Sequence, residues 1–175
     1  MEKITQVLVS KETIAERAKE LGQQISRDYK GEELGLIGVL KGGFVFLADL
    51  AREITIPVDV DFISVSSYGK STKSSGVVKI IKDIDTDISD KHVIIVEDIV
   101  DTGLTLKHLK HLLQTRGPKS LKVCTALDKP SRRTVELDIE YEGIVIPDKF
   151  VVGYGLDYAG KYRNLPDVCV MEVEE

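Results

Sequence analysis

Three acidic residues follow a short apolar run and form the part of the sequence best suited to chemistry. The run from Val93 to Val96 is aliphatic and mostly β-branched, which predicts a central strand buried on both faces of a parallel sheet. Glu97 and Asp98 follow it directly, and Asp101 comes three residues later. Because ligands bind beyond the carboxyl ends of parallel strands, we expect these acids to line a binding site.

The turn after the acids is suited to a phosphate group. Leucines between Leu104 and Leu113 recur at helical spacing, so we expect a helix that begins near Thr102. A helix N-terminus offers free N–H groups to an anion. The expected phosphate cradle consists of amides and hydroxyls of five consecutive residues: Asp101, Thr102, Gly103, Leu104 and Thr105.

Glu97 and Asp98 would repel that phosphate, so they should face a diol, a metal ion or both. A sugar phosphate with vicinal hydroxyls has this layout. The alternative is an acidic surface loop that caps an ordinary helix, since Asp and Thr are good N-cap residues. Capping requires one such residue, whereas three acids and two threonines occur here within nine positions.

The elements around this stretch alternate between helical and strand patterns, which predicts an α/β fold with a mostly parallel central sheet flanked by helices. We see no internal repeat or linker, so we expect residues 1–175 to form one domain. The expected helices cover residues 10–30, 44–53 and 102–113, and the expected strands cover residues 34–40, 58–62, 77–81, 93–96, 121–127, 144–146, 150–155 and 167–173.

A second candidate anion site is the glycine-rich turn Lys41-Gly42-Gly43, which joins an expected strand to an expected helix. Its glycines would let backbone N–H groups approach an anion closely, although a plain strand-to-helix turn explains them equally well. The segment from Gly155 to Lys161 resembles a P-loop, but Tyr162 stands where the magnesium-binding hydroxyl is required. We therefore reject a nucleotide-triphosphatase.

The composition excludes several classes of protein. The net charge of −5 argues against a nucleic-acid partner, and no stretch approaches the roughly 20 apolar residues of a membrane span. The N-terminus does not resemble a signal peptide. Cys124 and Cys169 each lie in a strand-like run, so we expect reduced core cysteines and a cytoplasmic protein.

Two segments resemble a known family. The sequence Val-Glu-Asp-Ile-Val-Asp-Thr-Gly-Leu-Thr at 96–105 is similar to the phosphoribosyl-pyrophosphate-binding motif of the phosphoribosyltransferases. The segment from Lys149 to Tyr158 is similar to the purine-binding segment of their hypoxanthine(-guanine) branch. The resemblance spans most of the chain, from Leu40 to Arg163. It implies the type I phosphoribosyltransferase fold, in which segments from the chain ends form a small hood.

The resemblance also implies roles at the purine end of the site. Lys129 would donate to the exocyclic oxygen of the purine, Phe150 would stack on its ring, and Val151 would contact it through the backbone. Asp101 is the candidate general base at N7. The polar segment from Ser67 to Gly76 resembles a mobile lid, of which Ser67 and Tyr68 would contact the substrate.

The resemblance implies further roles at the pyrophosphate and metal sites. Leu40, Lys41, Gly42 and Gly43 would bind pyrophosphate, with a cis peptide bond between Leu40 and Lys41, and Arg163 would lie nearby. Glu97 and Asp98 would hold the ribose hydroxyls, and the residues expected to hold Mg²⁺ are Glu97, Asp98 and Asp157.

The implied reaction is transfer of the phosphoribosyl group from phosphoribosyl pyrophosphate to N9 of a 6-oxopurine. Hypoxanthine and also guanine would give IMP and GMP in purine salvage, with release of pyrophosphate. The resemblance implies a homodimer or a homotetramer. Two other interpretations remain at this stage: a transferase for a different base, and a regulator that senses phosphoribosyl pyrophosphate without turnover.

Overall fold

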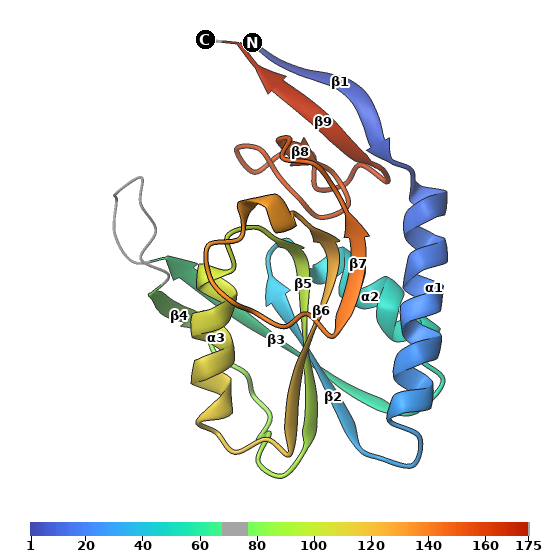
Figure 1. The fold of residues 1–175 in the computed structure, drawn as a ribbon, viewed down its shortest axis with the longest axis vertical. Coiled ribbons are helices and arrows are strands. Elements are labelled where there is room, and N and C mark those ends of the chain that lie inside the picture. The colour runs from blue at the N-terminus through green and yellow to red at the C-terminus, as the bar shows by residue number, and fades with distance from the viewer. Residues whose placement is uncertain (68–76, 175) are drawn as a thin grey trace.

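The computed structural model describes residues 1–67 and 77–174 (Figure 1). Its helices are α1 (Lys11–Asp28), α2 (Phe44–Glu53), α3 (Leu104–Gln114) and the short 3-10 helix η1 (Pro130–Arg132). Its strands are β1 (Glu2–Val9), β2 (Leu34–Leu40), β3 (Val58–Ser67), β4 (Val78–Lys82), β5 (His92–Val100), β6 (Ser120–Asp128), β7 (Tyr141–Val145), β8 (Val151–Val152) and β9 (Val168–Val173).

The main sheet has six strands in the order β4-β3-β2-β5-β6-β7. All neighbours pair in parallel except β4, which runs antiparallel to β3. The expected α/β fold with a mostly parallel sheet is therefore confirmed. Because β2, β5 and β6 are parallel and adjacent, their carboxyl ends lie at one edge of the sheet, where all three loops can contact one ligand.

The central strand β5 is buried on both faces, as its β-branched run predicts. Ile94 and Val96 lie in the core with α1 and α2, whereas Val93 and Ile95 lie in the core with the leucines of α3. Figure 1 shows α3 on one side of the sheet and α1 and α2 on the other. A strand packed on both sides gives the acidic residues that follow it a rigid support.

The two ends of the chain form a small antiparallel sheet in the order β1-β9-β8, which confirms the expected hood (Figure 1). The amino group of Met1 donates to the Glu174 carbonyl at 2.7 Å, so the chain ends lie side by side. The first amide of α1, at Lys11, donates to Asp167 Oδ1 at 2.7 Å, and the Tyr154 hydroxyl donates to Asp49 Oδ2 at 2.6 Å. The hood is thus bonded to both α1 and α2.

Several boundaries differ from the sequence predictions. The central strand does not end at Val96 but continues to Val100, because residues 97, 99 and 100 still pair with β6. Helix α3 begins at Leu104 rather than near Thr102, since Gly103 has a left-handed φ of 86° that a helix cannot contain. Strand β7 begins three residues before the expected Ile144, and the expected strand at 150–155 is reduced to two residues.

The two cysteines lie in the core of the protein. Cys124 and Cys169 are free and buried, as expected. Within the described part of the chain, no helix is long and apolar enough to cross a membrane.

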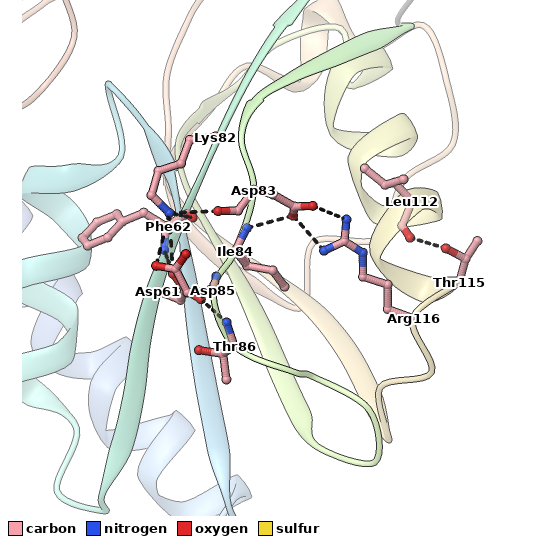
Figure 2. Close-up of polar contacts among 10 residues, drawn as sticks. All are labelled: Asp61, Phe62, Lys82, Asp83, Ile84, Asp85, Thr86, Leu112, Thr115 and Arg116. Carbon is pink, nitrogen blue, oxygen red and sulfur yellow. Dashed lines mark hydrogen bonds and ion pairs between the residues drawn. The ribbon is translucent and has the colours of Figure 1, made fainter.

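The alternation of Val58, Val60 and Phe62 with Asp59 and Asp61 predicts one polar face for β3, and this expectation is wrong. Val60 is 47% exposed, whereas the side chain of Asp61 is only 12% exposed. Asp61 accepts hydrogen bonds from the amides of Phe62, Asp85 and Thr86 at 2.7–2.9 Å (Figure 2). The Asp61 carboxylate therefore holds the loop that leads from β4 into β5, and long-range backbone donors, not the alternation of residue types, determine its burial.

A second carboxylate holds the same loop from the other side. Asp83 forms a two-bond ion pair with Arg116, at 2.7 and 2.8 Å, and accepts the amide of Ile84 at 2.8 Å (Figure 2). Arg116 lies just beyond α3, so the pair joins the β4–β5 loop to the helix that carries the expected phosphate site. Hydrogen bonding to Arg116 holds the pKa of Asp83 below its ordinary value.

We expect Asp61→Asn to lower the free energy of unfolding by about 1–3 kcal/mol, because an amide cannot accept all three N–H groups and turns its own donor toward them. Burial opposes ionisation of Asp61, yet the three amides outweigh it and hold the pKa below its ordinary value of 3.8. The contribution of Asp61 is thus present above pH 3.8 and is lost as the pH falls through the lowered pKa. Urea unfolding at pH 3 and pH 7 measures both effects.

The matched control is Asp59→Asn, which makes the same chemical change at an exposed site of the same strand. It should change stability by less than about 0.5 kcal/mol. Equal losses in the two variants would contradict the anchoring role of Asp61.

Candidate functional site

A pocket of about 280 Å³ lies at the carboxyl edge of the sheet, where β5 passes into α3. It contains five of the polar or glycine residues that the sequence predicts: Glu97, Asp101, Thr102, Gly103 and Thr105. Its remaining lining residues are apolar and were not predicted as site residues: Val39, Val65, Ile99, Val100 and Leu106. The structure therefore places an expected sugar-binding acid, the candidate base and most of the expected phosphate cradle in one hollow.

The two adjacent acids of β5 are held in an apolar environment. Burial is the largest effect on Glu97 and raises its pKa well above the ordinary value, and the neighbouring charge of Asp98 raises it further. Burial also raises the pKa of Asp98, although the Ile99 amide opposes this by donating to Asp98 Oδ1 at 2.6 Å. In the described residues no lysine or arginine forms an ion pair with either acid. Such a pair is suited to a ligand that brings hydroxyls or a cation.

The glycine-rich turn after β2 lies directly against these acids. The Gly43 amide donates to the Val39 carbonyl at 2.9 Å, and the Leu40–Lys41 peptide bond is cis, as the resemblance implies. A Cβ on Gly42 would overlap the Asp98 carboxylate, and a Cβ on Gly155 would overlap the Gly42 carbonyl. The turn therefore meets β5 and the loop between β8 and β9 (residues 153–167, the hood loop) at a point where an added Cβ atom has no room.

We expect Gly42→Ala to raise the KM for phosphoribosyl pyrophosphate about tenfold to a hundredfold. The new methyl group must displace the Asp98 carboxylate, and loss of one hydrogen bond to a charged group has roughly this effect. Steady-state kinetics measures the change. Gly35→Ala is the control, because Gly35 lies on β2, the strand before this turn, and its Cβ would meet only the His92 carbonyl, at 3.9 Å. Unchanged KM in Gly42→Ala would show that Asp98 does not contact the substrate.

Two hydrogen bonds to Thr102, one from within the loop and one from Thr134, hold the expected phosphate loop in place. The Leu104 amide donates to Thr102 Oγ1 at 3.4 Å, and the Thr102 carbonyl accepts the Thr134 amide at 3.1 Å. The Leu104 side chain lines a different hollow on α3, so only its backbone belongs to the cradle. The left-handed Gly103 immediately precedes α3, and the first-turn amides that follow Leu104 remain available to an anion.

Of the expected purine contacts, Lys129 directly follows β6 and is bonded to Val100 of this pocket, whereas Phe150 precedes β8 and lines a separate hollow. Lys129 is only 7% exposed, its amide donates to the Val100 carbonyl at 2.9 Å, and its ammonium group lies 3.9 Å from Asp148 Oδ1. Phe150 is 47% exposed and makes an edge contact with Tyr158, with ring centroids 5.9 Å apart. An aromatic residue that is half exposed is not explained by core packing, and it has a ring face free to stack.

The neighbouring Val151 is buried and begins β8, where it pairs with Val170 of β9. Pairing in the hood sheet therefore fixes the position of Val151, and its main chain is the part that the resemblance implies would contact the purine.

The hood loop brings the last expected site residues toward the turn after β2. Arg163 donates to the Gly155 carbonyl at 2.7 Å and lies 3.3 Å from Asp157 Oδ1. Asp157 Oδ2 also accepts the Gly160 amide at 2.9 Å. The described residues contain no group of three or more His, Cys, Asp or Glu side chains placed to hold a metal ion. The predicted metal residues Glu97, Asp98 and Asp157 therefore do not form a complete protein cage.

Sequence reasoning missed two arginines that contact the candidate base. Arg132 Nε donates to Asp101 Oδ1 at 3.0 Å, and Arg133 Nη1 donates to the Asp101 carbonyl at 2.6 Å. Arg133 also pairs at 2.5 Å with Asp128, which is buried at the end of β6. The only signal in the sequence was an arginine pair in a segment without clear periodicity. The lid contacts assigned to the Ser67 side chain and to Tyr68 lie outside the described residues.

Comparisons with known proteins agree with this geometry. The model of the phosphoribosyl transferase domain matches residues 7–159. The chain is 51% identical over 170 residues to the hypoxanthine phosphoribosyltransferase of Salmonella typhimurium, covering 96% of each chain. It is 49% identical to the hypoxanthine-guanine phosphoribosyltransferase of Bacillus subtilis, covering 97% of this chain and 94% of that one. The crystal structure of a hypoxanthine-guanine phosphoribosyltransferase from Bacillus anthracis is 53% identical and superposes with a TM-score of 0.93, covering 99% of this chain and 100% of that one.

Proposed function

Because this chain belongs to the phosphoribosyltransferase family, in its hypoxanthine(-guanine) branch, we propose that it transfers the phosphoribosyl group of phosphoribosyl pyrophosphate to N9 of a 6-oxopurine. The protein is a glycosyltransferase of purine salvage. Its proposed substrates are hypoxanthine and guanine, its nucleotide products are IMP and GMP, and its other product is pyrophosphate.

One observation carries this proposal: the carboxyl ends of β5 and β6 bring together the expected phosphate cradle, the acids Glu97 and Asp98, and the buried Lys129. The Lys129 amide bonded to the Val100 carbonyl joins the end of β6 to the end of β5, next to Asp101. A ligand with a phosphate in the cradle can therefore extend its sugar toward Glu97 and its base toward Lys129. This order of groups matches a ribose phosphate that is joined to a purine.

The chemistry follows from charge. As the bond from C1 of the ribose to pyrophosphate breaks, positive charge develops on the sugar while the purine N9 forms the new bond. Glu97 and Asp98 would bind the ribose hydroxyls, and negative charge there stabilises the cationic sugar. Asp101 would accept the proton from N7 as the base becomes a nucleophile.

Magnesium fits the donor set of the site. Mg²⁺ prefers carboxylate oxygens and is usually bound by one or two carboxylates, with substrate phosphates and water as its other ligands. Glu97 and Asp98, which have no ion pair in the described structure, meet that need, and a complete protein cage is not required. We propose that Glu97, Asp98 and Asp157 hold the ion, some of them through water or substrate. When bound, it would neutralise charge on pyrophosphate, together with the amides from Lys41 to Gly43.

Turnover of radiolabelled phosphoribosyl pyrophosphate against a panel of bases tests the proposal. The expected result is rapid formation of labelled IMP and GMP and little product with adenine, uracil or orotate. Rapid turnover with another base only would assign a different transferase. Binding without turnover of any base would favour a sensor, an alternative that the buried Lys129 and the exposed Phe150 argue against.

Three further properties are proposed with the activity. Residues 1–175 form one domain, because the Tyr154–Asp49 and Lys11–Asp167 bonds join the hood to α2 and α1, and thermal unfolding should then show one transition. The enzyme forms a homodimer or homotetramer, which light scattering of purified protein measures. It resides in the cytoplasm, where two free thiols remain reduced.

A further inference from the structure

The carboxylate of Asp101 is one end of a line of four alternating charges. Arg132 Nε donates to Asp101 Oδ1 at 3.0 Å, and Arg132 Nη1 lies 3.6 Å from Asp148 Oδ2. Asp148 Oδ1 lies 3.9 Å from the ammonium group of Lys129. The two ends of the line are the groups assigned to N7 and to the exocyclic oxygen of the purine. The two middle residues have no assigned role.

We propose that Arg132 is a positioning residue, which with Asp148 holds the Asp101 carboxylate and the Lys129 ammonium group at the separation that one purine requires. This inference rests on the proposed function, because it takes Asp101 as the base and Lys129 as the donor. It adds two residues, Arg132 and Asp148, that act through others and do not touch the substrate.

Exposure explains why Asp101 needs such support. The Asp101 side chain is 45% exposed, so packing alone does not select one rotamer for it. The guanidinium group of Arg132 is planar and rigid, and it can bridge two carboxylates in a fixed geometry. By donating to Oδ1 it leaves Oδ2 of Asp101 for the proton that the purine releases. Arg133 has a separate task, since it bonds the main chain of Asp101 to the buried Asp128.

Lys129 differs from Asp101, because its side chain is buried but flexible. Its ammonium group is buried, with the side chain only 9% exposed, but it stands on a flexible stem. Asp148 is its ion-pair partner in the described residues, and Arg132 in turn limits where Asp148 can lie. Displacement of either end by about 1 Å is enough to lower a rate strongly.

The exposure of Arg132 and Asp148 predicts that this line of four charges affects the rate of turnover more than the stability of the fold. Arg132 and Asp148 have side chains 48% and 53% exposed, and ion pairs at such sites contribute little to folding. A residue that only stabilises the fold would show the reverse pattern, with a lower unfolding temperature and little change in rate.

Steady-state kinetics of Arg132→Gln, Asp148→Asn and the double variant tests the inference. We expect Arg132→Gln to lower kcat with hypoxanthine by about fivefold to fiftyfold and to leave KM for phosphoribosyl pyrophosphate within about twofold. Asp148→Asn should raise KM for hypoxanthine about threefold to tenfold, because Lys129 loses its partner. The fold-loss of kcat/KM for hypoxanthine in the double variant should be smaller than the product of the losses in the two single variants, because both residues act on the same line of charges.

Arg132→Lys and Arg52→Gln complete the design. Lysine retains the charge without the planar fork, so Arg132→Lys should recover part of the lost kcat. Arg52 forms an exposed ion pair with Asp49 on α2, at 3.7 Å, and Arg52→Gln removes an equal charge with an expected change in kcat of less than about twofold. Unfolding temperatures should agree among all variants within a few degrees.

The outcomes separate this inference from the proposed function. Wild-type protein that does not convert hypoxanthine would overturn the proposed function. Active wild-type protein with Arg132→Gln equal to it in kcat would overturn the positioning role alone. The positioning role would also be overturned if Arg132→Gln lowered kcat and the unfolding temperature together and Arg132→Lys recovered no kcat, because Arg132 would then be structural.

Discussion

Asp101→Asn is expected to lower kcat by about 10²–10⁴, the usual contribution of a positioned acid–base group. The carboxylate lies at the end of β5, in the pocket with the phosphate loop, and next to the buried Lys129. The asparagine side-chain oxygen can still accept the hydrogen bond from Arg132, and the main-chain carbonyl of residue 101 can still accept the one from Arg133, so the loop should keep its shape. An amide, however, does not accept a proton at neutral pH.

Calorimetry separates this role from a structural one. Binding of phosphoribosyl pyrophosphate to Asp101→Asn should remain within a few fold of wild type, because the amides of the cradle survive. Asp59→Asn, at an exposed site on β3, makes the same change and should retain full activity. Loss of binding in parallel with loss of rate would show that Asp101 supports the loop and is not the base.

The second large effect is the rejection of adenine. The ammonium group of Lys129 can donate hydrogen bonds but cannot accept them. Hypoxanthine presents an oxygen at position 6, whereas adenine presents an amino group there, so donor would face donor. Because Lys129 is only 7% exposed, its charge would stay desolvated and lack that partner. Sites built on buried hydrogen bonds reject a mismatched analogue by roughly 10⁴–10⁵.

We therefore expect kcat/KM for hypoxanthine to exceed that for adenine by at least about 10³, allowing for partial access of water at the rim. Lys129→Gln can present either a donor or an acceptor, and it should narrow the ratio mainly by lowering kcat/KM for hypoxanthine. Competition between the two bases in one assay measures the ratio directly. Use of adenine by the wild-type protein within tenfold of hypoxanthine would contradict both the role of Lys129 and the substrate class.

Consecutive residues carried most of the fold prediction. The buried strand at 34–40 and the helix at 44–53 have the bounds that the sequence predicts, because a short apolar run bounded by turn residues indicates a strand and apolar residues at helical spacing indicate a helix. The pocket likewise uses one continuous stretch, from Glu97 to Thr105, whose residue types already indicated a sugar phosphate. A motif that is continuous in the chain places its own members side by side, so no long-range information is needed.

Other features depend on groups that meet only after folding. Asp61 is partly buried against a loop whose amides, 24 and 25 residues away, bond to it, and the alternation along its strand predicted the opposite. Arg132 contacts Asp101 across 31 positions, from a segment without periodicity. The lack of space at Gly42 arises from Asp98, a residue of another strand. The sequence by itself thus determined most of the elements, although not β1, and it determined the chemical class of the site and its family, since these depend on neighbours in the chain. The tertiary structure alone decided which charges meet, because ion pairs and close contacts depend on distances that no local pattern records.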